Sequence, residues 1–215
     1  MKFKESVREI LAPHISPRLA ARAMQRRQQW KFSKLYGDFH IDEDFRAIAV
    51  SGLPNESRGI SGEIVNIVIK LRGPAKTVLL PGESNYVKTA WADLLGLDED
   101  SIITAGLAEH VDFKWNFEES PPSSLESVDC IVSQAILEHL IDPYKHVRDC
   151  WNLLNDNGHL ILHTVIPGFH YHRYPIDCLR FFPDWFEEVA KRMEAEVVYK
   201  YIGFSRIVYQ LRKPI

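Results

Sequence analysis

The chain has 215 residues, of which 46% are hydrophobic and 26% are charged, and its formal net charge is -3. This length fits one domain with a substantial buried core, and the weak negative charge gives no reason to expect a nucleic-acid partner. Because the sequence contains no run of 18 apolar residues and no apolar export segment near its start, we expect no membrane association and a cytoplasmic location.

The first 74 residues are predicted to form a helical extension or cap. Within residues 1–36, basic side chains are interspersed with apolar ones, as in one or two amphipathic helices. A second helical pattern over residues 61–73 ends at Gly73-Pro74, a typical stop signal. The basic face could contact phosphate or a membrane surface, but we favour a solvated face on a helical cap that packs beside the substrate opening.

Strands and helices alternate from Lys76 onward. Apolar runs predict strands over residues 76–82, 101–106, 111–117, 127–133 and 159–167, and helical patterns cover residues 85–97, 144–158 and 182–194. Two β-rich runs around Gly203 predict a final hairpin. Residues 75–215 are therefore predicted to be an α/β domain with a doubly wound, Rossmann-like sheet that is mostly parallel and ends in an antiparallel hairpin.

Three cysteines are present, Cys130, Cys150 and Cys178. They are widely spaced, and no two of them have the CxxC spacing of a metal or redox motif. We therefore interpret them as buried thiols, and not as a disulfide framework or a zinc site.

Polar and aromatic residues gather just after the predicted strands. In doubly wound sheets, ligands bind beyond the carboxyl ends of the strands, where the strand order switches. The segment after the strand at 159–167 is rich in His and Tyr and also contains Asp177 and Arg180. The segment after the strand at 127–133 contains Glu138 and His139. These segments are the best candidates for a functional site.

From about Lys76 to Pro214 the chain resembles SAM-dependent methyltransferases of the Rossmann-like class, in particular their type 11 and related bacterial branches. The resemblance rests on residues 127–167, where a strand, Leu-Glu-His, Asp-Pro, a helix, a glycine turn and another strand follow one another. The segment YPIDCLRFFPDWF, residues 174–186, extends it. The resemblance implies methyl transfer as the reaction and S-adenosyl-L-methionine (SAM) as the cofactor.

The resemblance also implies where SAM binds. The loop after the first strand provides Gly82 and Glu83, although Gly82 stands alone where the family has several spaced glycines. Gly106 occupies a place where related enzymes have an acidic residue for the ribose. The remaining predicted cofactor contacts are Asn116, Phe117, Ser133 and Gln134.

Catalysis of methyl transfer to a hydroxyl requires removal of a proton, so a general base is expected. The predicted catalytic residues are His170, His172, Asp177 and His139. Glu138 and His139 also have a structural interpretation, because a carboxylate is favoured near a helix N-terminus and a nearby His can bond to backbone. A metal held by His170, His172 and Asp177 is a further alternative, but no metal is predicted.

The functional prediction is a SAM-dependent methyltransferase that acts on a small-molecule or glycan-like acceptor, most simply at oxygen. The alternative is a catalytically inactive, methyltransferase-like binding or scaffold protein, because the glycine-rich motif is degenerate. A homo-oligomer is compatible with the sequence.

Overall fold

The computed structural model describes residues 74–173, 175–202 and 206–215, together with scattered positions before residue 74. The predicted N-terminal cap and its place beside a substrate opening therefore lie mostly outside the described residues, as do Tyr174 and the hairpin turn at Gly203. The described positions from Leu19 to Lys34 are helical and exposed. A domain boundary at residue 74 stays a prediction.

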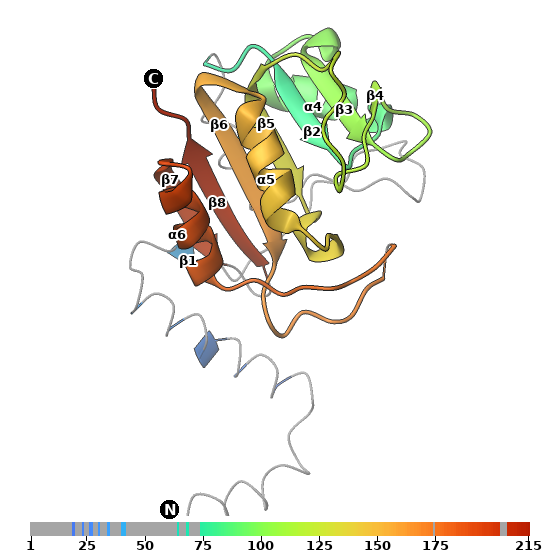
Figure 1. The fold of residues 1–215 in the computed structure, drawn as a ribbon. Helices are drawn as coiled ribbons and strands as arrows, with labels where there is room; N and C mark the ends of the chain where they lie inside the picture. Colours follow the sequence, from blue (N-terminus) through green and yellow to red (C-terminus); the bar gives the residue numbers. More distant parts are fainter. Residues whose placement is uncertain are drawn as a thin grey trace, which may run out of the picture.

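The domain is built on one mixed sheet (Figure 1). Its strands are β1 His40–Ile41, β2 Val78–Pro81, β3 Ile102–Gly106, β4 Phe113–Lys114, β5 Val128–Gln134, β6 Leu154–Val165, β7 Glu196–Ile202 and β8 Arg206–Arg212, in the order β1-β7-β8-β6-β5-β2-β3-β4. β8 runs antiparallel to both of its neighbours, β6 and β7, whereas the other described pairs are parallel. The predicted doubly wound sheet with a C-terminal antiparallel hairpin is confirmed.

Helices cover both faces of the sheet. They are α4 Lys88–Leu95, α5 Pro143–Asn152 and α6 Pro183–Arg192, with the 3-10 turns η3 Asn85–Val87, η4 Glu99–Ser101 and η5 Leu137–His139. In β2, Val78 and Leu80 face the core under α4, while Leu79 faces the core under α5 and α6. Because successive strand residues point to opposite faces, one apolar run supplies both cores.

Two predicted boundaries are corrected by the structure. The predicted helix over 144–158 ends at Asn152, and β6 starts at Leu154, before the predicted start at residue 159. Asn157 has a φ of 62°, which a helix cannot contain, and the side-chain amide of Asn155 donates to Asp129 on β5 at 2.8 Å. The segment therefore joins the edge of β5 through a register shift instead of extending α5.

The cysteine prediction is partly wrong. Cys130 and Cys150 are buried, and burial raises the pKa of Cys130 to about 12, but Cys178 is exposed. Cys178 lies in the loop that precedes α6, where its amide donates to the carbonyl of Glu138 at 2.8 Å and holds the backbone in place without burying the thiol.

The strand order switches between β2 and β5, because the chain continues from β2 to β3 on one side and returns to β5 on the other. The loops after Pro81 and Gln134 therefore diverge at this edge, which is where doubly wound sheets bind ligands. No helix among the described residues has the length and apolar character needed to cross a bilayer. The cytoplasmic location stays a prediction.

Candidate functional site

Two glycines lie side by side at the switch point. Gly82 follows β2 with a φ of +80°, and its amide donates to the carbonyl of Ala105 at 2.7 Å. A Cβ at Gly82 would lie 3.0 Å from Cδ1 of Ile136, and a Cβ at Gly106 would lie 3.5 Å from the Cα of Gly82. Backbone from two strands thus comes close together here, and only glycine fits without strain at position 82.

A buried polar pair spans the same switch point. Gln134, the last residue of β5, donates from Nε2 to Oε1 of Glu83 at 3.2 Å, and both residues are buried. Both were predicted cofactor contacts, and the hydrogen bond holds the Glu83 carboxylate between the ends of β2 and β5.

The other predicted cofactor residues have internal partners. The amide of Asn116 donates to Glu119 at 3.2 Å, and its oxygen accepts from the backbone of Glu118 at 3.2 Å, so this side chain stabilises its own turn. The ring of Phe117 packs edge-on against Trp115 at 5.0 Å. These contacts orient the loop after β4 toward the sheet edge.

Ser133 points into the layer beneath α5. Its hydroxyl lies 3.0 Å from Nε2 of His146, and both residues are fully buried. Burial, together with the charge of Lys145, lowers the pKa of His146 to about 3, so the imidazole is neutral. The sequence showed no sign of His146 as a buried polar residue, because it occupies a helix position of the apolar kind and only the packed structure shows that its side chain is buried.

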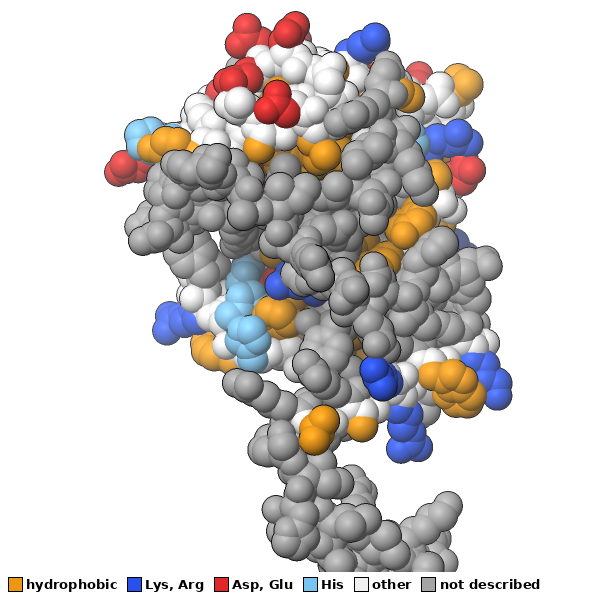
Figure 2. All heavy atoms as spheres, turned by 180° about the vertical axis from the view of Figure 1, so that it is seen from behind, with side chains coloured by type: hydrophobic (Ala, Val, Ile, Leu, Met, Phe, Trp, Pro, Cys, Tyr) orange, Lys and Arg blue, Asp and Glu red, His pale blue; other side chains and the backbone are white. Residues whose placement is uncertain are grey.

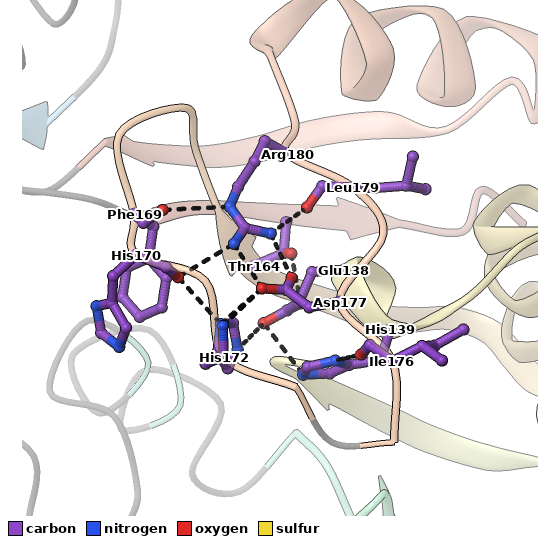
Figure 3. Close-up of polar contacts among 10 residues, drawn as sticks. All are labelled: Glu138, His139, Thr164, Phe169, His170, His172, Ile176, Asp177, Leu179 and Arg180. Carbon is purple, nitrogen blue, oxygen red and sulfur yellow. Dashed lines mark hydrogen bonds and ion pairs between the residues drawn. The ribbon is translucent and has the colours of Figure 1, made fainter.

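The second half of the site centres on Glu138 in η5 (Figure 3). The Glu138 side chain is fully buried, and the hydroxyl of Thr164, near the end of β6, donates to its Oε2 at 2.6 Å. Its Oε1 lies 3.9 Å from Nε2 of His139 and 3.7 Å from Nε2 of His172. This oxygen accepts no hydrogen bond from the described residues.

The two imidazoles turn their Nε2 atoms toward Glu138, and each Nδ1 faces backbone or a carboxylate. Nδ1 of His139 contacts the carbonyl oxygen of Ile176. Nδ1 of His172 lies 3.4 Å from the carbonyl oxygen of His170 and 3.4 Å from Oδ2 of Asp177. A carbonyl oxygen can only accept, so these contacts require a proton on Nδ1. In the neutral imidazole the lone pair then lies on Nε2.

Asp177 and Arg180 brace the loop that carries His172. Arg180 forms a bidentate ion pair with Asp177, and its guanidinium also donates to the carbonyl of His170 at 3.1 Å. The hydrogen bond from Arg180 holds the pKa of Asp177 well below its usual range. Asp177 also accepts from the His172 amide at 2.7 Å, so its contacts orient His172, and its catalytic role stays a prediction.

His170 and His172 differ in their surroundings. The ring of His170 stacks on Phe169 with centroids 4.4 Å apart and points away from Glu138 (Figure 3). The side chain of His172 is 31% exposed, so it is reachable from solvent while it faces the buried carboxylate. Figure 2 shows histidine side chains gathered on one face of the molecule beside a basic side chain. The structure thus joins His139 and His172 and leaves His170 outside the group.

Comparison with known proteins agrees with this fold. Residues 85–162 match the family described as a methyltransferase domain. A search of curated proteins found no match.

Several solved structures that share this fold are methyltransferases. The CcbJ methyltransferase from Streptomyces caelestis aligns with a TM-score of 0.56 and 13% identity, over 71% of this chain and 89% of that one. The N-methyltransferase NodS from Bradyrhizobium japonicum, solved with S-adenosyl-L-homocysteine, aligns with a TM-score of 0.50 and 12% identity, over 71% and 87%.

An O-methyltransferase family protein from Burkholderia thailandensis aligns with a TM-score of 0.51 and 10% identity over 71% of this chain. The alignment covers 55% of that protein, so this chain spans about half of its length. The matched family and the sheet order agree: residues 85–162 match a methyltransferase domain, and the sheet has the Rossmann-like fold of SAM-dependent methyltransferases.

Proposed function

We propose that this methyltransferase domain transfers the methyl group of SAM to an oxygen atom of a small-molecule or glycan-like acceptor. The observation that carries the proposal is the buried Glu138 carboxylate, whose Oε1 faces Nε2 of both His139 and His172 at the carboxyl edge of the sheet. A hydroxyl is a poor nucleophile until its proton is lost, and this group of residues can assist that loss.

The proposed SAM position lies over the switch point. Gly82 and Gly106 allow the backbone to approach the methionine part of the cofactor closely, and the Glu83 carboxylate, held by Gln134, faces the same edge. The loop of Asn116 and Phe117 borders the adenine side. Ser133 supports this region indirectly, because its hydroxyl is engaged by His146.

Among the residues around Glu138, where we place the acceptor, His172 is the one best able to contact it. It is partly exposed, its ring is oriented by Asp177, and it faces a buried carboxylate. His139 lies deeper, with its side chain 7% exposed, and it acts through the same carboxylate. His170 is a weaker candidate because its ring stacks on Phe169.

The test separates cofactor binding from chemistry. Calorimetric titration of the full chain with SAM and with S-adenosylhomocysteine should give one site. Replacement of His172 by Ala should leave SAM affinity nearly unchanged and reduce methyl transfer by about 10²–10⁴-fold, far more than replacement of His170 does. Transfer can be followed with labelled SAM and a panel of hydroxylated small molecules and glycans.

Two outcomes contradict the proposal. Absence of SAM binding at millimolar concentration would favour the second candidate, a catalytically inactive binding or scaffold protein. That candidate stands because Gly82 is alone where the family has several glycines. Unchanged turnover in the His172 variant would assign the loop of residues 167–180 to structure alone.

A further inference from the structure

We propose that Glu138, His139 and His172 bind a divalent transition-metal ion. The three candidate ligand atoms, one carboxylate oxygen and two imidazole nitrogens, all lie within 4.8 Å of one another. Metal–ligand bonds of about 2.0–2.2 Å place neighbouring ligand atoms about 3.0–3.5 Å apart. The separations of 3.7 and 3.9 Å from Glu138 Oε1 therefore need to contract by about 0.2–0.9 Å.

The buried carboxylate oxygen of Glu138 is suited to binding a cation. Oε1 of Glu138 is fully buried and accepts no hydrogen bond from the described residues, which is costly for a carboxylate. When the two imidazoles are neutral, both facing Nε2 atoms present lone pairs, because each Nδ1 faces an acceptor. Three electron-rich atoms thus point at one another, and a positive charge between them removes their repulsion.

A proton fits this arrangement less well than a metal ion. A protonated His172 would have to move from 3.7 Å to within about 2.7–3.2 Å of Glu138 to donate a normal hydrogen bond, a larger shift than metal binding needs. One proton can also serve only one of the two imidazole–carboxylate pairs. A metal ion can bind all three atoms at once.

The surroundings of the three side chains are those of a metal centre. The distal nitrogens of both histidines face acceptors, the carbonyl of Ile176 for His139 and Asp177 for His172. The second oxygen of Glu138 accepts from Thr164 at 2.6 Å. Such outer contacts fix the tautomer and orientation of metal-binding histidines and carboxylates.

The ligand set also limits which ion binds. Two imidazoles and one carboxylate suit Zn²⁺, Co²⁺, Fe²⁺ or Mn²⁺, whereas Ca²⁺ and Mg²⁺ prefer sites made only of oxygen. Three protein ligands leave coordination positions for a substrate oxygen. If the proposed function holds, His172 would act as a ligand of the ion and not as the base itself. The ion would bind the acceptor hydroxyl and lower its pKa, which favours acceptors with a hydroxyl able to chelate, such as vicinal diols.

The experiment measures metal binding on the full chain without any acceptor. Protein freed of metal with a chelator is titrated with Co²⁺, whose visible absorption reports coordination, and then with Zn²⁺ in competition. We expect one equivalent to bind to the native protein, and neither Mg²⁺ nor Ca²⁺ to displace it. Replacement of His172 by Ala should weaken the affinity by more than the roughly 10–100-fold expected for loss of an outer contact.

His170→Ala is the matched control, because His170 lies on the same loop and its ring points away from Glu138. This variant should bind Co²⁺ like the native protein. Glu138→Gln is a second test, interpreted only when its thermal unfolding remains cooperative.

Three results would overturn the proposed site. They are equal Co²⁺ affinity in the native protein and the His172 variant, loss of Co²⁺ binding in the His170 variant, and no stoichiometric Co²⁺ binding by the native protein. The SAM titration is run in parallel. SAM binding without metal binding removes the metal inference and leaves the proposed function standing, whereas metal binding without SAM binding removes the proposed function and leaves the metal site.

Discussion

Replacement of Thr164 by Val tests how firmly Glu138 is held. Thr164 and Glu138 are both fully buried, and the hydroxyl donates to Glu138 Oε2 at 2.6 Å. Valine has nearly the same shape as threonine, so the substitution removes the hydrogen bond without opening a cavity. A hydrogen bond to a charged group contributes about 1.5–3 kcal/mol, so the free energy of unfolding should fall by about that amount.

The assay is urea unfolding, with thermal unfolding as a check. For a chain of this size the same loss corresponds to a fall of about 3–12 °C in Tm. Thr164→Ser is the control, because it keeps the donor and removes one methyl group, which costs about 1 kcal/mol. Combining Thr164→Val with Glu138→Gln should reveal a coupling energy of about 0.5–3 kcal/mol.

The reasoning would be refuted if Thr164→Val lowered the free energy of unfolding no more than Thr164→Ser does. A coupling energy near zero in the double-mutant cycle would have the same meaning, since it would show that the hydroxyl and the carboxylate do not stabilise each other in solution.

Two further predictions concern the backbone and pH. Gly82→Ala and Gly96→Ala each place a side chain at positive φ, and each should lower the free energy of unfolding by about 1–2 kcal/mol. Only Gly82→Ala should weaken SAM binding in calorimetry, because Gly96 lies at the end of α4, away from the switch point. Equal loss of SAM affinity in both variants would contradict the proposed cofactor position. Burial lowers the folded-state pKa of His146 to about 3, so the unfolded state takes up a proton first as pH falls. Stability should therefore be full above about pH 6.5 and fall below it, by at most about 1.4 kcal/mol per pH unit from this group. Urea unfolding at several pH values should show a shallower decline in His146→Gln; an identical decline in both proteins would mean that His146 is protonated in the folded state.

Much of the fold could be predicted from the sequence because local patterns carry it. The apolar run ending at Pro81-Gly82 is buried on both faces, so it is recognisable as a central strand, and the two runs around Gly203 form the expected antiparallel pair. The boundary between α5 and β6 was missed because it depends on Asn155 binding Asp129, a contact between segments far apart in the sequence.

For the site, the sequence indicated the correct edge of the sheet and the correct loops, since chemistry-bearing residues follow the strands in chain order. It also named both His139 and His172, but as separate candidates. Nothing local distinguishes His172 from His170, because both are loop histidines flanked by aromatic and basic residues.

The tertiary structure decided which side chains meet. Arg180 binds Asp177 and the carbonyl of His170, and this bracing turns His172 toward Glu138 while the His170 ring stacks outward on Phe169. The sequence by itself determined the alternation of strands and helices, because hydrophobic periodicity is a property of neighbouring residues. The grouping of Glu138, His139 and His172 required the loops after β5 and β6 to be folded against each other, because such contacts depend on distances in space that no local pattern encodes.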